Sequence, residues 1–254
     1  MNPWAIGLPA AGATLLGVGV WAAASPGSQL FGPTTRRLPG SAGRPRIALT
    51  FDDGPNPEIT PKLLDLFERN QARATFFVLG KFARACPDLI REIDARGHLL
   101  ANHTDTHPHL AWHSRSRNAI ELRACEEAVG EALAQVKTTA LNRASSVKMK
   151  WMRPPFGFRG PQMWNAMRET GVERVAMWSR LCFDWKPQPA EHVIRRLAGV
   201  VPGDIVLMHD GDHRALGGDR RHTLAALEHW LPRWRDSGIE FVTIDAAGAA
   251  AGRE

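Results

Sequence analysis

Short apolar runs alternate with helix-like segments along most of the chain, and this alternation limits the possible folds more than any other feature. Strands that alternate with helices build βαβ units, whose strands run parallel in a sheet or barrel. Seven such strands predict an α/β domain of barrel type. The predicted strands are 46–51, 74–79, 98–102, 149–153, 173–178, 204–208 and 239–243. The predicted helices are about 60–70, 87–96, 117–135, 161–170, 189–200 and 220–236.

Polar residues gather where several of these predicted strands end. In parallel α/β architectures the carboxyl ends of the strands meet on one face, and active sites are built there. Five separate clusters on one rim are hard to explain by packing, so we predict a functional site on that face. The clusters are Asp52-Asp53, His103–His107, Arg153-Pro154-Pro155, Asp184-Trp185 and His209-Asp210.

The adjacent carboxylates Asp52 and Asp53 carry the most chemical information. Like charges this close cannot both ionise cheaply unless a cation or a proton lies between them. His103 and His107 follow a second apolar run and offer two imidazoles. Two imidazoles and one carboxylate suit a divalent metal, and the second carboxylate is then free to act on a metal-bound water. The pattern therefore predicts a metal site.

Composition narrows the class of protein. The chain has 254 residues, of which 44% are hydrophobic and 23% charged, as expected for a globular protein of one large domain or two small ones. The net charge of +6 is compatible with an acidic polymer or an anionic membrane surface as partner, and equally with Arg-rich solvated faces. No basic and aromatic stripe indicates nucleic acid binding. Three cysteines with these spacings argue against a disulfide scaffold.

The amino-terminal stretch from Pro3 to Ala24 contains no charged residue. Its length and polarity predict a transmembrane helix with Trp4 and Trp21 as interfacial anchors. A cleaved signal peptide is the alternative, because Ala22-Ala23-Ala24 offers small residues. The absence of Lys or Arg before the apolar run weakens that alternative.

Five segments of the chain, taken in order, closely resemble motifs of the polysaccharide deacetylases, which form carbohydrate esterase family 4 with its NodB homology domain. This family includes chitin and peptidoglycan N-acetylglucosamine deacetylases. The resemblance covers roughly residues 44 to 245 and implies a distorted (β/α)7 barrel, in agreement with the seven predicted strands. The matching segments are Thr50–Pro55, His103-x-x-x-His107, Arg153–Gly157, Phe183–Trp185 and Leu207–His209.

The resemblance implies chemical roles for individual residues. Asp53, His103 and His107 would bind a divalent metal, usually zinc. Asp52 would be the general base that deprotonates the bound water. His209 would be the general acid that protonates the departing amine.

Other motif residues would support these groups. By the same resemblance, Arg153 would orient Asp52 through an ion pair, and the backbone N–H near Phe156 would help to hold the oxyanion. We expect Leu207 to line the pocket for the acetyl group. Trp185 is either a wall of that pocket or part of the barrel packing.

At two positions the sequence departs from the family pattern, and this affects how the family's residue roles apply to this chain. Leu181 stands where well-known members carry an Asp that pairs with the acid histidine, so Asp184 or Asp210 would have to replace it, unless the histidine is tuned differently. Phe156 stands where a Tyr is common, which matters little if the backbone N–H is the contributing group.

Three further polar residues near the second motif are candidates for extra ligands. We interpret His109 and His113 as loop residues, because the three-ligand site is already complete, and Asp105 as a cap of the loop.

The predicted domains follow from these observations. A membrane-spanning or signal segment at 1–24 and a linker at 25–45 precede a catalytic domain at 46–245 and a tail at 246–254. The predicted activity is metal-dependent removal of N-acetyl groups from amino sugars in a polysaccharide or glycoconjugate. An O-acetyl esterase, another C–N hydrolase and a non-catalytic glycan-binding module are the alternatives.

The predicted location depends on two opposing signals. Arg36 and Arg37 follow the apolar segment and, by the positive-inside rule, favour a cytoplasmic domain. The substrate class that the resemblance implies lies outside the cytoplasm. We expect an anchored or secreted protein whose catalytic domain faces the cell envelope, because two arginines are a weak orienting signal.

Overall fold

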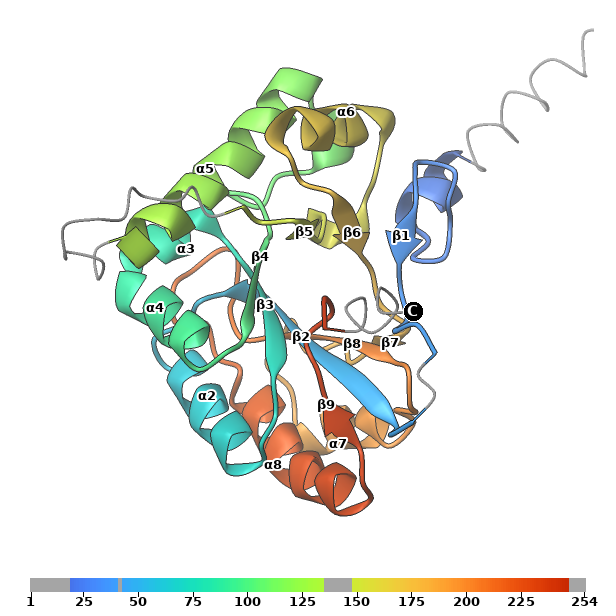
Figure 1. The fold of residues 1–254 in the computed structure, drawn as a ribbon, viewed down its shortest axis with the longest axis vertical. Helices are drawn as coiled ribbons and strands as arrows, with labels where there is room; N and C mark the ends of the chain where they lie inside the picture. The colour runs from blue at the N-terminus through green and yellow to red at the C-terminus, as the bar shows by residue number, and fades with distance from the viewer. Residues whose placement is uncertain (1–18, 41–42, 135–147, 247–254) are drawn as a thin grey trace, which may run out of the picture.

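The computed structural model describes residues 19–40, 43–134 and 148–246 (Figure 1). Most of the predicted membrane segment at 1–24, and the predicted tail apart from residue 246, therefore lie outside the described residues. Residues 19–24 are helical. In the part of the chain that the structure describes, no helix is long and apolar enough to cross a bilayer.

A nine-stranded sheet of the described residues forms the centre of the domain, in the order β1-β6-β5-β4-β3-β2-β8-β7, with β9 paired to β2. The paired strands run parallel, and the sheet is curled into an incomplete barrel. The predicted fold class is confirmed. The strands are β1 Thr34–Thr35, β2 Arg46–Gly54, β3 Ala74–Val78, β4 Leu99–Asn102, β5 Trp151–Met152, β6 Arg174–Ala176, β7 Arg180–Leu181, β8 Ile205–His209 and β9 Glu240–Phe241.

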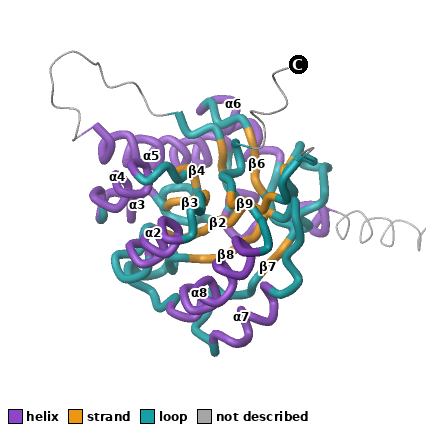
Figure 2. The backbone as a smooth tube through the Cα atoms, turned by 60° about the horizontal axis from the view of Figure 1, so that its bottom comes forward, coloured by secondary structure: helices purple, strands orange, loops and turns teal. Residues whose placement is uncertain are grey.

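Helices surround the curled sheet, as Figure 2 shows, with α6 at the top of the view, α7 and α8 at the bottom and α2 to α5 toward the left. All six predicted helices are present, with ends shifted by a few residues at most. The helices are α2 Thr60–Arg69, α3 Gly80–Ala85, α4 Pro87–Ala95, α5 Arg115–Ala134, α6 Pro161–Thr170, α7 Ala190–Leu197 and α8 Arg221–Asp236.

The sequence patterns missed α3 and the two-residue strands β1 and β7. Helix α3 has six residues, too few to show a helical apolar period. It also begins at Gly80, where an added Cβ would lie 2.7 Å from the Cα of Cys125 in α5. Close packing against α5 therefore defines this helix, and close packing has no local sequence signature.

The main core lies between the sheet and the helices. Phe51 of β2 stacks on Phe76 of β3 with ring centroids 5.3 Å apart, and both rings contact Phe67 of α2. All three side chains are fully buried. At roughly 1.5–3 kcal/mol for each such side chain, this cluster stabilises the central strands that carry the polar motifs.

The segment predicted as a linker, 25–45, is in part joined to the domain. Within it, β1 pairs with β6, and Leu38 is buried. The guanidinium of Arg159 donates hydrogen bonds to the backbone carbonyls of Ser25 and Ser28. These contacts hold residues of the predicted linker between Ser25 and Leu38 against the domain.

Candidate active site

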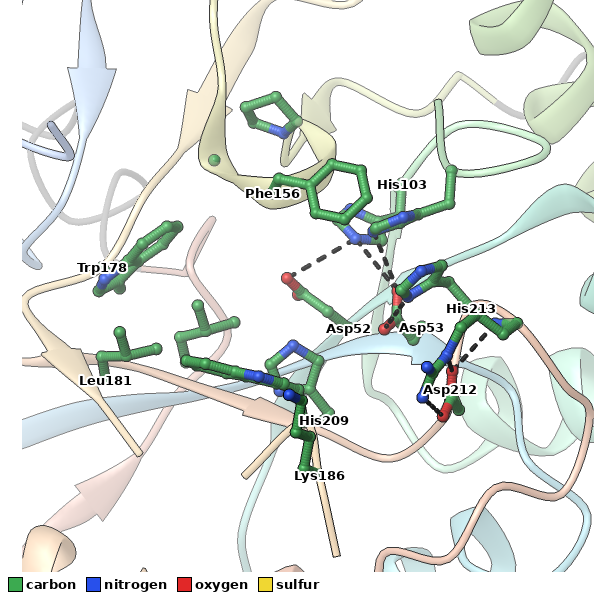
Figure 3. Close-up of a pocket in the computed structure, with 16 residues that line it drawn as sticks. Asp52, Asp53, His103, Phe156, Trp178, Leu181, Lys186, His209, Asp212 and His213 are labelled. Atoms are coloured by element: carbon green, nitrogen blue, oxygen red, sulfur yellow. Dashed lines mark hydrogen bonds and ion pairs between the residues drawn. The ribbon is translucent and has the colours of Figure 1, made fainter. Parts of the chain in front are cut away.

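A cavity of about 470 Å³ opens at the carboxyl ends of the central strands (Figure 3). It collects polar residues from segments that are far apart in the sequence. Arg153 and Asp184 are fully buried, each bonded to a residue of the cavity wall. The predicted site residues that line it are Asp52, Asp53, His103, His107, Phe156, Trp185, Leu207 and His209.

Strand β2 is longer than predicted and includes both carboxylates. Neighbouring side chains of a regular strand point to opposite faces. The register with β3 shifts between Asp52 and Gly54, and Asp53 has a positive φ of 70°. A bulge of this kind re-aims a side chain. As a result Asp52 and Asp53 both face the cavity, although they are adjacent in the chain.

Two imidazoles converge on one oxygen of Asp53. The Nε2 atoms of His103 and His107 lie 3.5 Å and 3.3 Å from Asp53 Oδ1. His103 Nδ1 lies 2.8 Å from the carbonyl of Arg153, so Nδ1 is the donor of that bond and Nε2 is turned toward Asp53. Asp53 Oδ1 is buried and has no hydrogen-bond partner among the described residues. A buried acceptor without a donor, facing two imidazole nitrogens, matches the donor set of a divalent cation site.

The protonation states agree with this arrangement. Burial acts to raise the pKa of Asp53, but the imidazoles of His103 and His213 outweigh it and hold the pKa well below its ordinary value. Burial, together with the neighbouring His103, lowers the pKa of His107 to about 2. The carboxylate is therefore charged and the His107 imidazole neutral at physiological pH, as metal binding requires.

Arg153 lies behind Asp52 and is fully buried. Its Nη1 donates hydrogen bonds to Asp52 Oδ1 at 2.7 Å and to Thr50 Oγ1 at 2.8 Å, and the guanidinium lies over the ring of Phe77. The carbonyl of Met177 accepts a third bond, from Nη2. The predicted ion pair is therefore present, and it holds one oxygen of Asp52 while the other, Oδ2, lies 3.8 Å from Nε2 of His103.

His209 enters the cavity from β8, directly beside Asp52, because the two residues are register partners on neighbouring strands. Its Nδ1 lies 2.9 Å from Oδ1 of the fully buried Asp184. Burial acts to lower the pKa of His209, but the Asp184 carboxylate outweighs it and raises the pKa to about 9. The imidazole is then protonated at neutral pH.

Of the two carboxylates considered in place of Leu181, Asp184 contacts His209. Asp210 instead accepts a hydrogen bond of 2.5 Å from Thr60, beneath the corner of β2, and burial raises its pKa to about 7. Leu181 lines the cavity (Figure 3).

The loop from His103 to His107 is held by α5. Glu121 accepts hydrogen bonds from the backbone N–H groups of Asp105 and Thr106 and from the Thr106 hydroxyl. The carboxylate of Asp105 pairs with Arg84, 2.5 Å away. Asp105 therefore belongs to the support of the loop, as the sequence indicated, whereas the contribution of Glu121 had no signal in the motif.

Backbone conformations that non-glycine residues rarely adopt are concentrated around the cavity. Each such residue costs about 1–3 kcal/mol, which the surrounding structure must offset, and such residues cluster at functional sites. The residues with positive φ here are Asp53, Thr104, His107, Phe156 and Phe183.

The cavity walls are aromatic and aliphatic. Trp185 lies 6.1 Å from the ring of His209 and is 38% exposed, so it forms a wall of the cavity more than part of the packed interior. Leu207 is almost fully buried at its base. Phe156 stacks on His109 at 4.0 Å, so His109 packs against the wall, as expected for a loop residue.

Sequence patterns missed several lining residues. The most important is His213, whose Nδ1 lies 3.4 Å from Asp53 Oδ2. Ligand atoms of Asp53, His107 and His213 all lie within 4.8 Å of one another. A histidine four residues after His209 was the available signal. The other lining residues that were not predicted are Trp178, Lys186, Asp212 and Arg214, whereas Pro154, Gly157 and Leu181 lie in the motifs already named.

Comparison of the sequence with known proteins shows which family this chain belongs to. Residues 40–175, more than half of the chain, match the family model described as polysaccharide deacetylase. A chitooligosaccharide deacetylase of Sinorhizobium fredii is 36% identical over 211 residues, which is 80% of this chain and 93% of that protein. The chain belongs to the polysaccharide deacetylase family.

Two further comparisons agree with this membership. A peptidoglycan-N-acetylglucosamine deacetylase of Bacillus cereus is 31% identical over 209 residues, which is 81% of this chain and 69% of that protein. The solved structure of a family 4 carbohydrate esterase from Streptomyces lividans, in complex with acetate, has a TM-score of 0.64 and 25% identity. The match covers 78% of this chain and 91% of the chain in that structure. The predicted family is confirmed.

Proposed function

We propose that this polysaccharide deacetylase hydrolyses N-acetyl groups from amino sugars in a polysaccharide or glycoconjugate. The observation that carries the proposal is that a carboxylate and an imidazole, each held by a buried partner, lie side by side at one cavity. Asp52, held by Arg153, and His209, held by Asp184, occupy register positions on neighbouring strands. The similar proteins of Sinorhizobium fredii and Bacillus cereus are named for chitooligosaccharide and for peptidoglycan N-acetylglucosamine.

The donor set beside this pair fits a divalent cation, for which Asp53, His103 and His107 are the proposed ligands. One carboxylate and two imidazoles suit Zn²⁺ best, and they leave positions open for water and substrate. When bound, such an ion polarises an amide carbonyl and lowers the pKa of water. The orphaned Oδ1 of Asp53 supports this assignment.

Asp52 is the proposed general base. Arg153 holds Oδ1, so Oδ2 is the oxygen available to accept a proton from the attacking water. His209 is the proposed general acid. With Nδ1 bonded to Asp184, its Nε2 is left for the cavity, and its raised pKa keeps a proton there for the departing amine nitrogen. The amine cannot leave without that proton.

The walls complete the proposed reaction site. Leu207 and Trp185 would contain the acetyl methyl group, which is apolar and small. The backbone N–H of Phe156 would donate to the oxyanion, a role that does not depend on the phenyl ring and so tolerates Phe in place of Tyr.

The deciding experiment is a substrate panel. Acetate release is measured from chitooligosaccharides, peptidoglycan and acetylated xylan, with the protein chelated and then reloaded with Zn²⁺. We expect release from an N-acetylated glycan, loss after chelation and recovery with Zn²⁺. Release from xylan alone would instead identify an O-acetyl esterase. No release from any substrate by the reloaded protein would favour a glycan-binding module.

A second experiment tests the ligand assignment. His103→Ala is expected to lose tight Zn²⁺ binding, whereas Asp52→Asn is expected to retain the ion and lose turnover. Full zinc content in the His103→Ala variant would contradict the ligand set.

We further propose that the protein acts outside the cytoplasm, with residues 1–24 as a membrane anchor. Support comes from the uncharged composition of that segment and from the relatives named for peptidoglycan. Protease accessibility of the domain in intact spheroplasts tests the location. A protected domain would contradict it, and a mature amino terminus near Ser25 would show a cleaved signal instead.

A further inference from the structure

His213 lies on the rim loop between β8 and α8, opposite His103 across Asp53 (Figure 3). It is about one-third exposed, unlike His103 and His107, which are buried. Its imidazole makes two contacts with the proposed cation ligands. One is to the carboxylate of Asp53, and the other is to the ring of His107.

The two carboxylate oxygens of Asp53 face different partners. Oδ1 faces the two Nε2 atoms of His103 and His107 and has no hydrogen-bond partner. Oδ2 lies 3.4 Å from Nδ1 of His213. This polar contact at Oδ2 restricts the rotation of the carboxylate about its Cβ–Cγ bond and so presents Oδ1 to a cation.

The contact with His107 compensates for a missing hydrogen bond. Imidazoles that bind metals almost always donate their second nitrogen to an outer acceptor, which fixes the ring. His103 has such an acceptor in the Arg153 carbonyl. His107 Nδ1 is buried with no partner in the described structure. Its ring stacks on His213, with centroids 4.1 Å apart and planes 20° apart, and meets Phe156 edge-on from another side.

The loop that carries His213 is itself held in place. Lys81 Nζ donates a hydrogen bond of 2.6 Å to the carbonyl of His213. Asp212 pairs with Arg214 and with the buried Arg220. Gly211 approaches so closely that an added Cβ would lie 2.0 Å from the carbonyl oxygen of Asp53. These contacts attach the loop to β2, to α3 and to Arg220 at the start of α8, so His213 is positioned before any ligand arrives.

We propose that His213 is a positioning residue of the cation site, which orients Asp53 through Oδ2 and His107 through ring stacking. This inference rests on the cation site proposed above. It adds a fourth side chain that acts through two of the three ligands and leaves the open positions of the site free for water and substrate.

The test measures the affinity of the full-length protein for Zn²⁺ by competition with a chromophoric chelator. His213→Ala removes both contacts, and we expect affinity to fall about 10–100-fold, the usual cost of losing an outer partner of a metal ligand. His213→Phe keeps a ring for stacking but loses the donor, and His213→Asn keeps a donor but loses the ring. Each is expected to recover part of the affinity. His192→Ala, which removes an exposed histidine of α7, is the matched control.

The visible spectrum of the Co²⁺-loaded protein separates positioning from ligation. A positioning role predicts that His213→Ala keeps the coordination number of the wild type while it binds Co²⁺ more weakly. Wild-type affinity in His213→Ala would overturn the inference. A changed coordination number, with a loss as large as in His103→Ala, would overturn it too, because His213 would then be a ligand. If His103→Ala itself binds Zn²⁺ normally, the proposed site fails, and that result is distinct from a failure at His213 alone.

Discussion

Both carboxylate oxygens of Asp184 bind His209. Oδ1 lies 2.9 Å from the imidazole Nδ1, and Oδ2 accepts the backbone N–H of His209 at 2.9 Å. Oδ2 also accepts the hydroxyl of Thr223, and the backbone carbonyl of Asp184 lies 2.8 Å from Nε2 of His222. This network fixes the position, the tautomer and the charge of the proposed acid.

The first prediction concerns the alkaline limit of activity. Asp184→Asn removes the charge that raises the His209 pKa to about 9. The alkaline limb of the kcat/KM profile should therefore move to lower pH by about 1–3 units. Thr223→Val, which removes a bond to Asp184 but keeps its charge, should move the limb much less. An unchanged limb in Asp184→Asn would show that another group sets it.

The second prediction concerns stability against pH. The folded-state pKa of His209 is raised above 6.5, so its contribution to stability is complete below pH 6.5 and is lost as pH rises through about 9. The pKa of Asp184 is lowered below 3.8, because the charge of His209 and its hydrogen bonds outweigh the effect of burial. Its contribution is present above that value and is lost in more acidic solution.

The difference in unfolding free energy between wild type and Asp184→Asn should therefore be largest between about pH 4 and 6.5, at about 1–3 kcal/mol, and should shrink toward pH 9. Urea unfolding across this range measures it. A difference that is constant with pH would contradict a charged pair.

The third prediction separates the base from the acid by leaving group. On an N-acetylated oligosaccharide, Asp52→Asn and His209→Ala should each lose about 10²–10⁴ in rate. On 4-nitrophenyl acetate the leaving group departs without a proton, so His209→Ala should keep much of its rate while Asp52→Asn should not. Equal losses for His209→Ala on both substrates would argue against its role as an acid.

The fourth prediction concerns the support of the His103–His107 loop. Glu121→Ala removes the acceptor of three hydrogen bonds in that loop. We expect weaker Zn²⁺ binding with the fold retained, because the loop sets the spacing of two proposed ligands. Calorimetric titration with Zn²⁺ measures the effect. Glu127→Ala, an exposed position on the same helix, should bind as the wild type does, and parallel losses in both variants would point to helix stability instead.

The fifth prediction concerns the amino-terminal segment. The Arg159 guanidinium is buried and donates hydrogen bonds to the carbonyls of Ala22, Ser25 and Ser28. Arg159→Leu leaves these carbonyls without their donor, and we expect faster hydrogen exchange over residues 22–35 and a lower Tm. Arg168→Leu, exposed on α6, is the control. Protection unchanged in Arg159→Leu would mean that β1 alone holds the segment.

Local patterns predicted much of this molecule. The parallel α/β class followed from the alternation of strands and helices, since that alternation reflects which side chains are buried. Asp52, Asp53, His103, His107 and His209 were chosen from motifs at strand ends, and the structure brings them to one cavity. The strand ends of a parallel sheet converge whatever the intervening loops contain. Local sequence motifs were therefore enough to predict that these five residues share one site.

Other features depended on contacts between distant segments. Asp184 or Asp210 could have served His209, and only the packing of the chain after β7 against β8 selected Asp184. Glu121 and His213 reach the site from α5 and from a rim loop, and neither belongs to a motif. Segment 25–38 looked like a linker because its contacts are to Arg159 and β6, which lie more than a hundred residues away. Sequence periodicity records burial and local conformation, whereas the choice among polar partners is made by tertiary distance.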